Sequence, residues 1–106
     1  MSGTVEKVTD ESFANFIKSK PLVIVDCWAA WCGPCQMIGP IIEELSREHS
    51  EKIAFGKLNV DENREVPVKY QVMSIPTLLF FKDGQHVDTI LGAVPKSVIE
   101  QKINQL

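Results

Sequence analysis

Apolar residues along the chain switch between strand-like runs and helical spacing, and this alternation predicts the order of the elements. Five short apolar runs are typical of strands: Val5–Val8, Leu22–Trp28, Ile53–Val60, Thr77–Phe81 and His86–Leu91. Four segments carry helical spacing or a helix-start signal: Thr9 to Ile17, Pro34 to about His49, Glu62 to Tyr70 and Pro95 to Leu106. The sequence therefore predicts the order β-α-β-α-β-α-β-β-α.

The run Leu22–Trp28 is apolar at nearly every position, as in a strand that is covered on both faces, so we expect it at the centre of the sheet. Strands separated by helices are expected to pair in parallel, whereas Asp83-Gly84 between the last two runs predicts an antiparallel hairpin. The predicted fold class is α/β, with a mixed five-stranded sheet between two layers that together hold four helices. A chain of this length is expected to form a single domain, over residues 1–106.

Several polar residues and prolines mark where the helices begin or bend. Thr9-Asp10 is expected to cap the first helix, Pro67 fits only in or near the first turn of the third, and Pro95 starts the last. Pro40 cannot donate a hydrogen bond to the carbonyl of Gln36, so a kink is expected in the second helix. The last helix is expected to turn one apolar stripe toward the sheet: Val98, Ile99, Ile103 and Leu106.

Composition and charge narrow the class of protein. The chain has 106 residues, of which 44% are hydrophobic and 24% charged, with a net charge of −3 at pH 7, as in an ordinary globular protein. There is no Lys/Arg run, and phosphate backbones repel a mildly acidic chain, so contact with DNA or RNA is not expected. The N-terminus lacks an apolar signal core and no apolar run reaches membrane-spanning length, which predicts a cytosolic protein without membrane contact.

Cys32 and Cys35 carry the most informative chemistry of the chain, because two thiols at this spacing can exchange a proton and a disulfide. Pro34 marks the start of a helix, so Cys32 is expected just outside its N-terminus. The unpaired N–H groups and the positive dipole end favour a thiolate there, which makes Cys32 the expected nucleophile. Cys35, about one turn into the helix on its buried side, is expected to resolve a mixed disulfide formed at Cys32.

The cysteine pair also permits a zinc half-site, a chance spacing or a stabilising disulfide. Zinc needs four ligands, and the further candidates are Cys27, His49 and His86, without a second Cys-x-x-Cys, so a metal site is not expected. A disulfide that closes so short a loop removes little chain entropy and is expected to be reducible. A Cys-x-x-Cys pair in a chain without an export signal favours redox chemistry. Cys27, in an apolar strand, is expected to be a packing residue.

Asp26 lies in the middle of the apolar central run, where an unpaired carboxylate is costly and its pKa is expected to rise. Strand alternation places it on one face with Ile24 and Trp28. We expect Asp26 to accept the proton of Cys35, directly or through water, and the alternative is a structural pair with a lysine. Lys57 is the expected partner because it occupies an interior position in its own strand, although an ordinary surface lysine is equally compatible with the spacing.

Ile75-Pro76, Gly92 and Trp31 are weaker candidates when they are judged from the residues alone. A proline that enters a strand is expected at its first residue or in a special bond geometry, and a cis bond would free backbone groups to pair with an extended peptide. Most X-Pro bonds are nevertheless trans. Gly92 fits a turn, or a place where a substrate backbone approaches. Trp31 fits ordinary packing, or an apolar contact that excludes water beside the sulfur atoms.

Together these residues resemble the thioredoxin family over essentially the whole chain. The matching motifs are Asp26-x-Trp28-Ala29-x-Trp31-Cys32-Gly33-Pro34-Cys35, Pro40, Lys57 with Asn59-Val60-Asp61, Ile75-Pro76-Thr77 and Gly92-Ala93. The Gly33-Pro34 dipeptide is highly specific, because the similar protein disulfide isomerase domains usually carry Gly-His there. Cys27 departs from the pattern, since many relatives carry Phe, and its smaller side chain must be offset by neighbours or leave a cavity.

The resemblance implies a thioredoxin fold, a cis Ile75-Pro76 bond and a set of site residues. An apolar docking surface around Cys32 is expected from Trp31, Ile75, Pro76, Gly92 and Ala93. Gly33, Pro34 and Lys57 are expected to tune the redox behaviour of the cysteine pair.

The resemblance implies that the chain reduces protein disulfides. No bound cofactor is expected, and the chain is expected to be a monomer. The expected electron donor is a thioredoxin reductase, either NADPH-flavin or ferredoxin-linked. The expected targets are disulfide-bearing proteins such as ribonucleotide reductase, peroxiredoxin and methionine sulfoxide reductase. Two alternatives stay open. The chain could be a disulfide oxidase or isomerase that uses the same thiols, or an interaction module whose role does not need the thiols.

Overall fold

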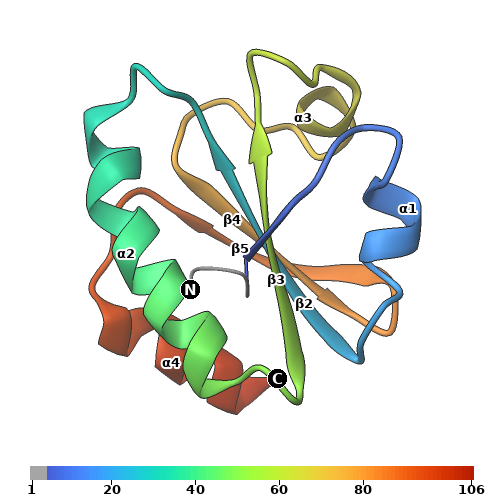
Figure 1. Cartoon of the computed structure of the whole chain (residues 1–106), viewed down its shortest axis with the longest axis vertical. Helices are drawn as coiled ribbons and strands as arrows, with labels where there is room; N and C mark the ends of the chain where they lie inside the picture. The colour runs from blue at the N-terminus through green and yellow to red at the C-terminus, as the bar shows by residue number, and fades with distance from the viewer. Residues whose placement is uncertain (1–4) are drawn as a thin grey trace.

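The computed structural model describes residues 5–106, and these residues form an α/β fold with a five-stranded mixed sheet and four helices (Figure 1). The strands are β1 (Val5–Lys7), β2 (Leu22–Trp28), β3 (Ile53–Asn59), β4 (Thr77–Lys82) and β5 (Gln85–Leu91). The helices are α1 (Phe13–Phe16), α2 (Gly33–Glu48), α3 (Glu65–Lys69) and α4 (Lys96–Gln105). The predicted fold class and order of elements are confirmed.

The sheet has the strand order β1-β3-β2-β4-β5, so the strand that was predicted to be central lies in the middle. β2 pairs in parallel with β3 and antiparallel with β4, and β4 continues antiparallel to β5. In this register Asp26 lies between Lys57 of β3 and Leu78 of β4. The carboxyl end of β2 leads through a short loop to Cys32 and the start of α2, which contains Cys35.

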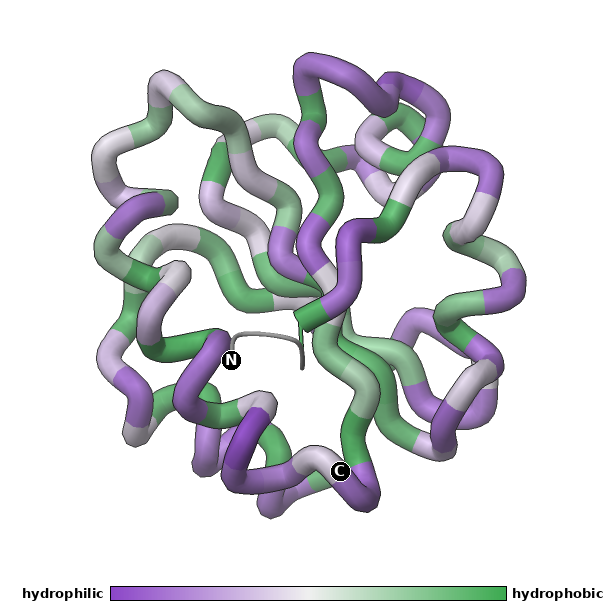
Figure 2. Tube along the Cα trace, viewed as in Figure 1, coloured by the Kyte–Doolittle hydropathy of each residue, from purple (hydrophilic) through white to green (hydrophobic). Residues whose placement is uncertain are grey.

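Each face of the sheet is covered by two helices, with α1 and α3 on one side and α2 and α4 on the other (Figure 1). The buried core on the first side contains Phe13, Phe16, Ile17, Val23, Val25, Cys27, Val66, Leu79 and Phe81. The buried core on the second side contains Ile24, Ile38, Ile42, Leu45, Phe55, Leu78, Phe80, Ile90 and Ile99. Figure 2 shows hydrophobic residues along the central strands and hydrophilic residues on the outer turns. Successive residues of β2 therefore serve opposite cores, as strand alternation predicts.

The predicted hairpin between the last two strands is confirmed. Asp83 and Gly84 have φ angles of 52° and 81°, the left-handed values that a tight turn between antiparallel strands requires. β4 and β5 pair on either side of this turn, with a register shift beside Phe81. Residues 5–106 contain no helix of the length and apolar character that crossing a membrane requires.

The predicted cap of the first helix is confirmed only in part. Thr9 Oγ1 accepts a hydrogen bond from the backbone N–H of Ser12 at 3.2 Å, in the turn that leads into α1. α1 begins only at Phe13 after Ser12, whose side chain makes no cap hydrogen bond to the helix. The carboxylate of Asp10 instead accepts hydrogen bonds from the backbone N–H groups of Glu65 and Val66, at 3.1 and 3.0 Å. Asp10 therefore accepts hydrogen bonds from N–H groups that the first turn of α3 leaves unpaired, although α3 lies far away in the sequence.

The other helices differ from the prediction mainly at their ends. α3 begins at Glu65 rather than Glu62, and Pro67 falls in its first turn as expected. Pro95 is the residue before α4. Of the predicted apolar stripe, Ile99 is buried and Ile103 and Leu106 pack against the core, whereas Val98 is 38% exposed. α2 includes Pro40 and continues to Glu48, and the kink at Pro40 stays a prediction.

Candidate active site

Cys32 and Cys35 meet at the start of α2 and form a disulfide, with their Cα atoms 5.3 Å apart. Cys32 is the N-cap residue of the helix, and its sulfur accepts a hydrogen bond from the backbone N–H of Cys35 at 3.2 Å. Each residue of the pair is only 4% exposed. The structure therefore places the cysteines as the sequence predicts, one before the first turn and one inside it.

The start of α2 suits a thiolate at Cys32 once the disulfide is reduced. Pro34 occupies the first turn, where a residue without an N–H breaks no helical hydrogen bond. The first turn contains no acidic residue, so no carboxylate of the helix start itself opposes negative charge on the sulfur. The hydrogen bond from the Cys35 N–H and the positive end of the helix dipole both favour the anion.

The loop before β4 lies beside the cysteine pair through Ile75 and is hydrogen-bonded to the turn after β5. The Ile75-Pro76 bond is cis, as the resemblance implies. The N–H of Gly92 donates to the carbonyl of Pro76 at 2.9 Å, and Gly92 has a φ of 87°, which explains the need for glycine. Ile75 packs against the buried cluster that contains Cys32 and Cys35.

Asp26 is buried on the face of the sheet that α2 and α4 cover, since it follows Ile24 by two residues in β2. Its side chain is 4% exposed, and its Oδ1 atom has no hydrogen-bond partner. Burial raises the pKa of this carboxyl from 3.8 to about 7, and the positive charge of Lys57 acts in the opposite direction. Asp26 can therefore take up and release a proton near neutral pH.

The structure corrects the prediction that Lys57 occupies an interior position and pairs with Asp26. Lys57 is paired in register with Asp26, but its side chain is exposed rather than interior, and residues 5–106 show no ion pair between the two. Its Nζ atom lies 5.4 Å from the centroid of the Trp28 ring. A long side chain reaches solvent along an apolar surface, which explains why the predicted pair does not form.

The model of the thioredoxin family matches residues 4–105. The chain belongs to the thioredoxin family. Members of this family are oxidoreductases that act on protein disulfides, and the Cys32–Cys35 pair fits dithiol-disulfide exchange.

Thioredoxins from distant sources resemble this chain over nearly its whole length. Thioredoxin 2 of Chlorobaculum tepidum is 46% identical over 106 residues, which cover 99% of this chain and 97% of the relative. The chloroplastic M-type thioredoxin of Spinacia oleracea is 48% identical over 102 residues, or 95% of this chain and 56% of the relative. The crystal structure of the Malassezia sympodialis thioredoxin Mala s 13 superposes with a TM-score of 0.88 and 36% identity, covering 97% of this chain and 90% of that one.

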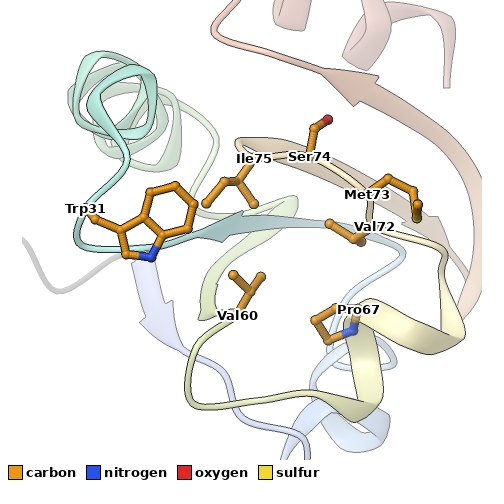
Figure 3. A pocket seen from close by; sticks show the side chains of 7 residues that line it. All are labelled: Trp31, Val60, Pro67, Val72, Met73, Ser74 and Ile75. Carbon is orange, nitrogen blue, oxygen red and sulfur yellow. The ribbon is translucent and has the colours of Figure 1, made fainter.

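Figure 3 shows a pocket of about 350 Å³, two of whose lining residues, Val60 and Ile75, also pack against the cysteine pair. It is lined by Trp31, Val60, Pro67, Val72, Met73, Ser74 and Ile75. Trp31 is 71% exposed, and its Nε1 atom donates to Asp61 at 2.8 Å. Of the predicted docking residues, Trp31 and Ile75 line this pocket. Outside it, Pro76 is buried, Gly92 is partly buried and Ala93 is exposed.

Sequence reasoning missed the other residues of this pocket. Val60 follows β3, Pro67 belongs to α3, and Val72 to Ser74 precede β4, so the walls come from separate segments. Val72-Met73 could have indicated this pocket, because these two large apolar residues are neighbours in a loop. Apolar side chains that gather on an exposed loop are typical of a surface that contacts another molecule.

Cys27 is fully buried in β2 and is not part of the disulfide. Burial and, to a smaller extent, the neighbouring charge of Asp26 together raise the pKa of its thiol to about 12. A thiol with so high a pKa does not form a nucleophile near neutral pH. The structure agrees with the expected packing role.

Among residues 5–106, Glu48, His49 and Glu100 each bring one possible metal-ligand atom within 4.8 Å of the others. Glu48 already forms an ion pair with Lys96, whose Nζ lies 2.7 Å from the Glu48 Oε2 atom. This cluster was not predicted, because it joins the end of α2 to α4. The second histidine, His86, lies within hydrogen-bond distance of Thr89, at 2.8 Å between Nε2 and Oγ1.

Proposed function

We propose that this chain is a general protein disulfide reductase, which carries electrons from a thioredoxin reductase to disulfides of target proteins. The observation that supports the proposal best is the placement of Cys32 at the N-terminus of α2 with Cys35 bonded to it from inside the first turn. This arrangement gives the two thiols different chemical environments and keeps them within reach of each other.

The proposed reaction begins with the reduced form. The Cys32 thiolate attacks one sulfur of a target disulfide, which forms a mixed disulfide and releases the other target sulfur as a thiolate that takes up a proton. The Cys35 sulfur then attacks the Cys32 sulfur of the mixed disulfide. The Cys32–Cys35 disulfide forms, the second target thiol leaves, and the target has gained two electrons and two protons.

Asp26 is proposed to take the proton of Cys35 during this second step, directly or through a water molecule. The support is its burial on the side of the sheet that α2 covers and its pKa of about 7, which matches the pH at which the exchange would run. Lys57 is proposed to act on this carboxyl through its charge, since that charge opposes the rise in the Asp26 pKa.

Gly33 and Pro34 are proposed to tune the redox behaviour of the pair. Both lie between the cysteines on the exposed side of the helix start. They leave the first turn free of charge and of bulky side chains, so the target sulfur can approach the Cys32 sulfur along this side.

Target proteins are proposed to dock on Trp31, Ile75, Pro76, Gly92 and Ala93. The exposed indole of Trp31 and the partly buried Ile75 supply apolar contact beside the cysteines. The Pro76 and Gly92 backbones lie together at the edge of the site and leave space for an extended target chain.

The proposed partners are those of the resemblance: a thioredoxin reductase as donor, and ribonucleotide reductase, peroxiredoxin or methionine sulfoxide reductase as acceptors. A monomer in the cytosol is proposed as the working form. The spinach relative is named as a chloroplastic protein. Fractionation of the source cells therefore tests whether this chain is located in the cytosol.

The reduction of insulin disulfides with dithiothreitol as donor tests the proposal. Wild-type protein is expected to speed the reduction, and Cys32→Ser and Cys35→Ser are each expected to lose turnover. Cys27→Ala is the matched control, because it removes a cysteine that lies outside the pair. Full turnover by Cys32→Ser, or faster oxidation of a dithiol peptide than reduction of its disulfide in a glutathione buffer, would contradict a reductase.

A further inference from the structure

The end of α2 and the middle of α4 bring two carboxylates and an imidazole together. Each of Glu48, His49 and Glu100 offers one ligand atom, and these three atoms lie within 4.8 Å of one another. No other three His, Cys, Asp or Glu side chains in residues 5–106 form such a group. α2 and α4 cover the same face of the sheet, so the group joins two neighbouring helices (Figure 1).

The backbone that carries these side chains is held in place. The N–H of His49 donates to the carbonyl of Leu45 at 3.0 Å, and the carbonyl of His49 accepts from the N–H of Ile53 at 2.9 Å. Glu100 follows Ile99, which is fully buried in the core under α4. A site whose residues stand on fixed helices positions its ligand atoms more precisely than a site on loops.

The charges at this end of α2 favour a cation. Glu48 is the last residue of α2 and His49 is its C-cap, so both lie at the negative end of the helix dipole. A cationic side chain already lies there, since the Lys96 Nζ atom is 2.7 Å from Glu48 Oε2 and 3.3 Å from Glu44 Oε1. A carboxylate has two oxygen atoms, so Glu48 can bind a metal ion with one while the other accepts from Lys96.

The imidazole of His49 distinguishes this group from the acidic clusters that are common on protein surfaces. Mg²⁺ and Ca²⁺ prefer oxygen ligands, whereas Zn²⁺ binds imidazole nitrogen together with carboxylate oxygen. His49 is half-buried and also lines a pocket of about 580 Å³ at this end of the molecule. An ion can therefore approach this residue from solvent.

We propose that Glu48, His49 and Glu100 form a binding site for a divalent metal ion of the zinc type, which accepts nitrogen and oxygen ligands together. Metal–ligand bonds of about 2.1 Å place the ligand atoms of a tetrahedral site about 3.4 Å apart. The three atoms, now within 4.8 Å, approach one another by about 1 Å when the ion binds, which rotation of the exposed Glu48 side chain allows. Three protein ligands leave the fourth position of the ion to water.

This site is separate from the cysteine pair, at which a metal ion is not expected. α2 has 16 residues, and at about 1.5 Å per residue its two ends lie about 24 Å apart. The metal ion therefore takes no part in disulfide exchange, and the inference does not rest on the proposed function. Its expected effect is to link α2 to α4 and so to stabilise the folded chain.

Isothermal titration calorimetry of the oxidised protein with Zn²⁺ at neutral pH tests the inference. The disulfide keeps the sulfurs of Cys32 and Cys35 from acting as thiolate ligands. Wild-type protein is expected to bind one Zn²⁺ ion per chain. His49→Gln and Glu100→Gln are each expected to weaken the binding about tenfold or more. His86→Gln is the matched control, because His86 is the second histidine and lies outside the group.

NMR spectra of the two histidine rings in wild-type protein show where the ion binds, independently of how any variant folds. Zn²⁺ is expected to shift the ring signals of His49 and to leave those of His86 in place. Lys96→Met is expected to bind Zn²⁺ more tightly than wild type, because no ammonium group then competes for Glu48.

Absence of Zn²⁺ binding by wild-type protein, wild-type affinity in His49→Gln or Glu100→Gln, or equal shifts of both histidine rings would overturn the inference. Unchanged or weaker binding by Lys96→Met would contradict the part assigned to Glu48. Displacement of Zn²⁺ by an equal concentration of Mg²⁺ would contradict the part assigned to the imidazole.

Discussion

The buried carboxyl of Asp26 leads to a quantitative prediction for the stability of the protein. Its side chain is 4% exposed, and its Oδ1 atom has no hydrogen-bond partner. Burial raises its pKa to about 7 from the 3.8 expected in the unfolded chain. The ionised form is therefore less favourable in the folded protein than in the unfolded chain.

The sign of the pH dependence follows from the number of bound protons. Between pH 3.8 and about pH 7 the unfolded chain binds fewer protons at this position than the folded protein, so stability falls as the pH rises. Below pH 3.8 the contribution of Asp26 to stability is fully present, and above about pH 7 it is lost. A difference of about three pKa units corresponds to about 4 kcal/mol of unfolding free energy.

Asp26→Asn removes this titration and tests the magnitude. The free energy of unfolding of the oxidised protein is measured by urea denaturation at several pH values from 4 to 9. The difference between variant and wild type is expected to shift in favour of the variant by about 4 kcal/mol over this range. The cost of burying the Asn amide does not change with pH, so it cancels from the comparison.

Glu62→Gln is the matched control, because it removes a carboxylate at an exposed position. The shift of about 4 kcal/mol is not expected in this variant, because its carboxylate is not buried. Parallel stability curves for wild type and Asp26→Asn from pH 4 to 9 would refute the reasoning, since they would mean that burial does not raise the pKa of Asp26.

Three further predictions concern residues around the site. Lys57→Gln removes a charge that lowers the pKa of Asp26, so the carboxyl is expected to titrate at a higher pH by carbon-13 NMR, and an unchanged midpoint would contradict this. Asp10→Ala removes the side-chain hydrogen bonds to α3 and is expected to lower the free energy of unfolding by about 1 kcal/mol in urea, whereas an unchanged value would mean that water replaces the carboxylate. Cys27 is expected to stay unlabelled by iodoacetamide in the reduced native protein at pH 8, because it is fully buried and the pKa of its thiol is about 12; rapid labelling there would show that β2 opens locally.

Local patterns predicted the parts of the fold that depend on local physics. The apolar run Leu22–Trp28 indicated a central strand because both of its faces had to be covered, and β2 lies there. Asp83-Gly84 indicated a tight turn because these residues tolerate left-handed φ angles. The same reasoning placed Cys32 before the first turn of α2 and Cys35 inside it.

Interactions between distant parts of the chain escaped prediction. Asp10 looked like a cap for the helix that follows it, but its partners lie 55 and 56 residues away. Lys57 has its ammonium group over the ring of Trp28 in the neighbouring strand, a contact that the pattern of its own strand does not indicate. The cis bond before Pro76 followed only from family resemblance, since local statistics favour trans.

Trapping of the mixed disulfide tests the central claim most directly. Reduced Cys35→Ser protein is mixed with insulin, quenched with acid, digested and measured by mass spectrometry. The proposal predicts a disulfide between Cys32 and an insulin chain that accumulates in this variant and is absent from Cys32→Ser. Absence of any adduct in Cys35→Ser, or an adduct through Cys27, would contradict the assignment of Cys32 as nucleophile and Cys35 as resolving cysteine.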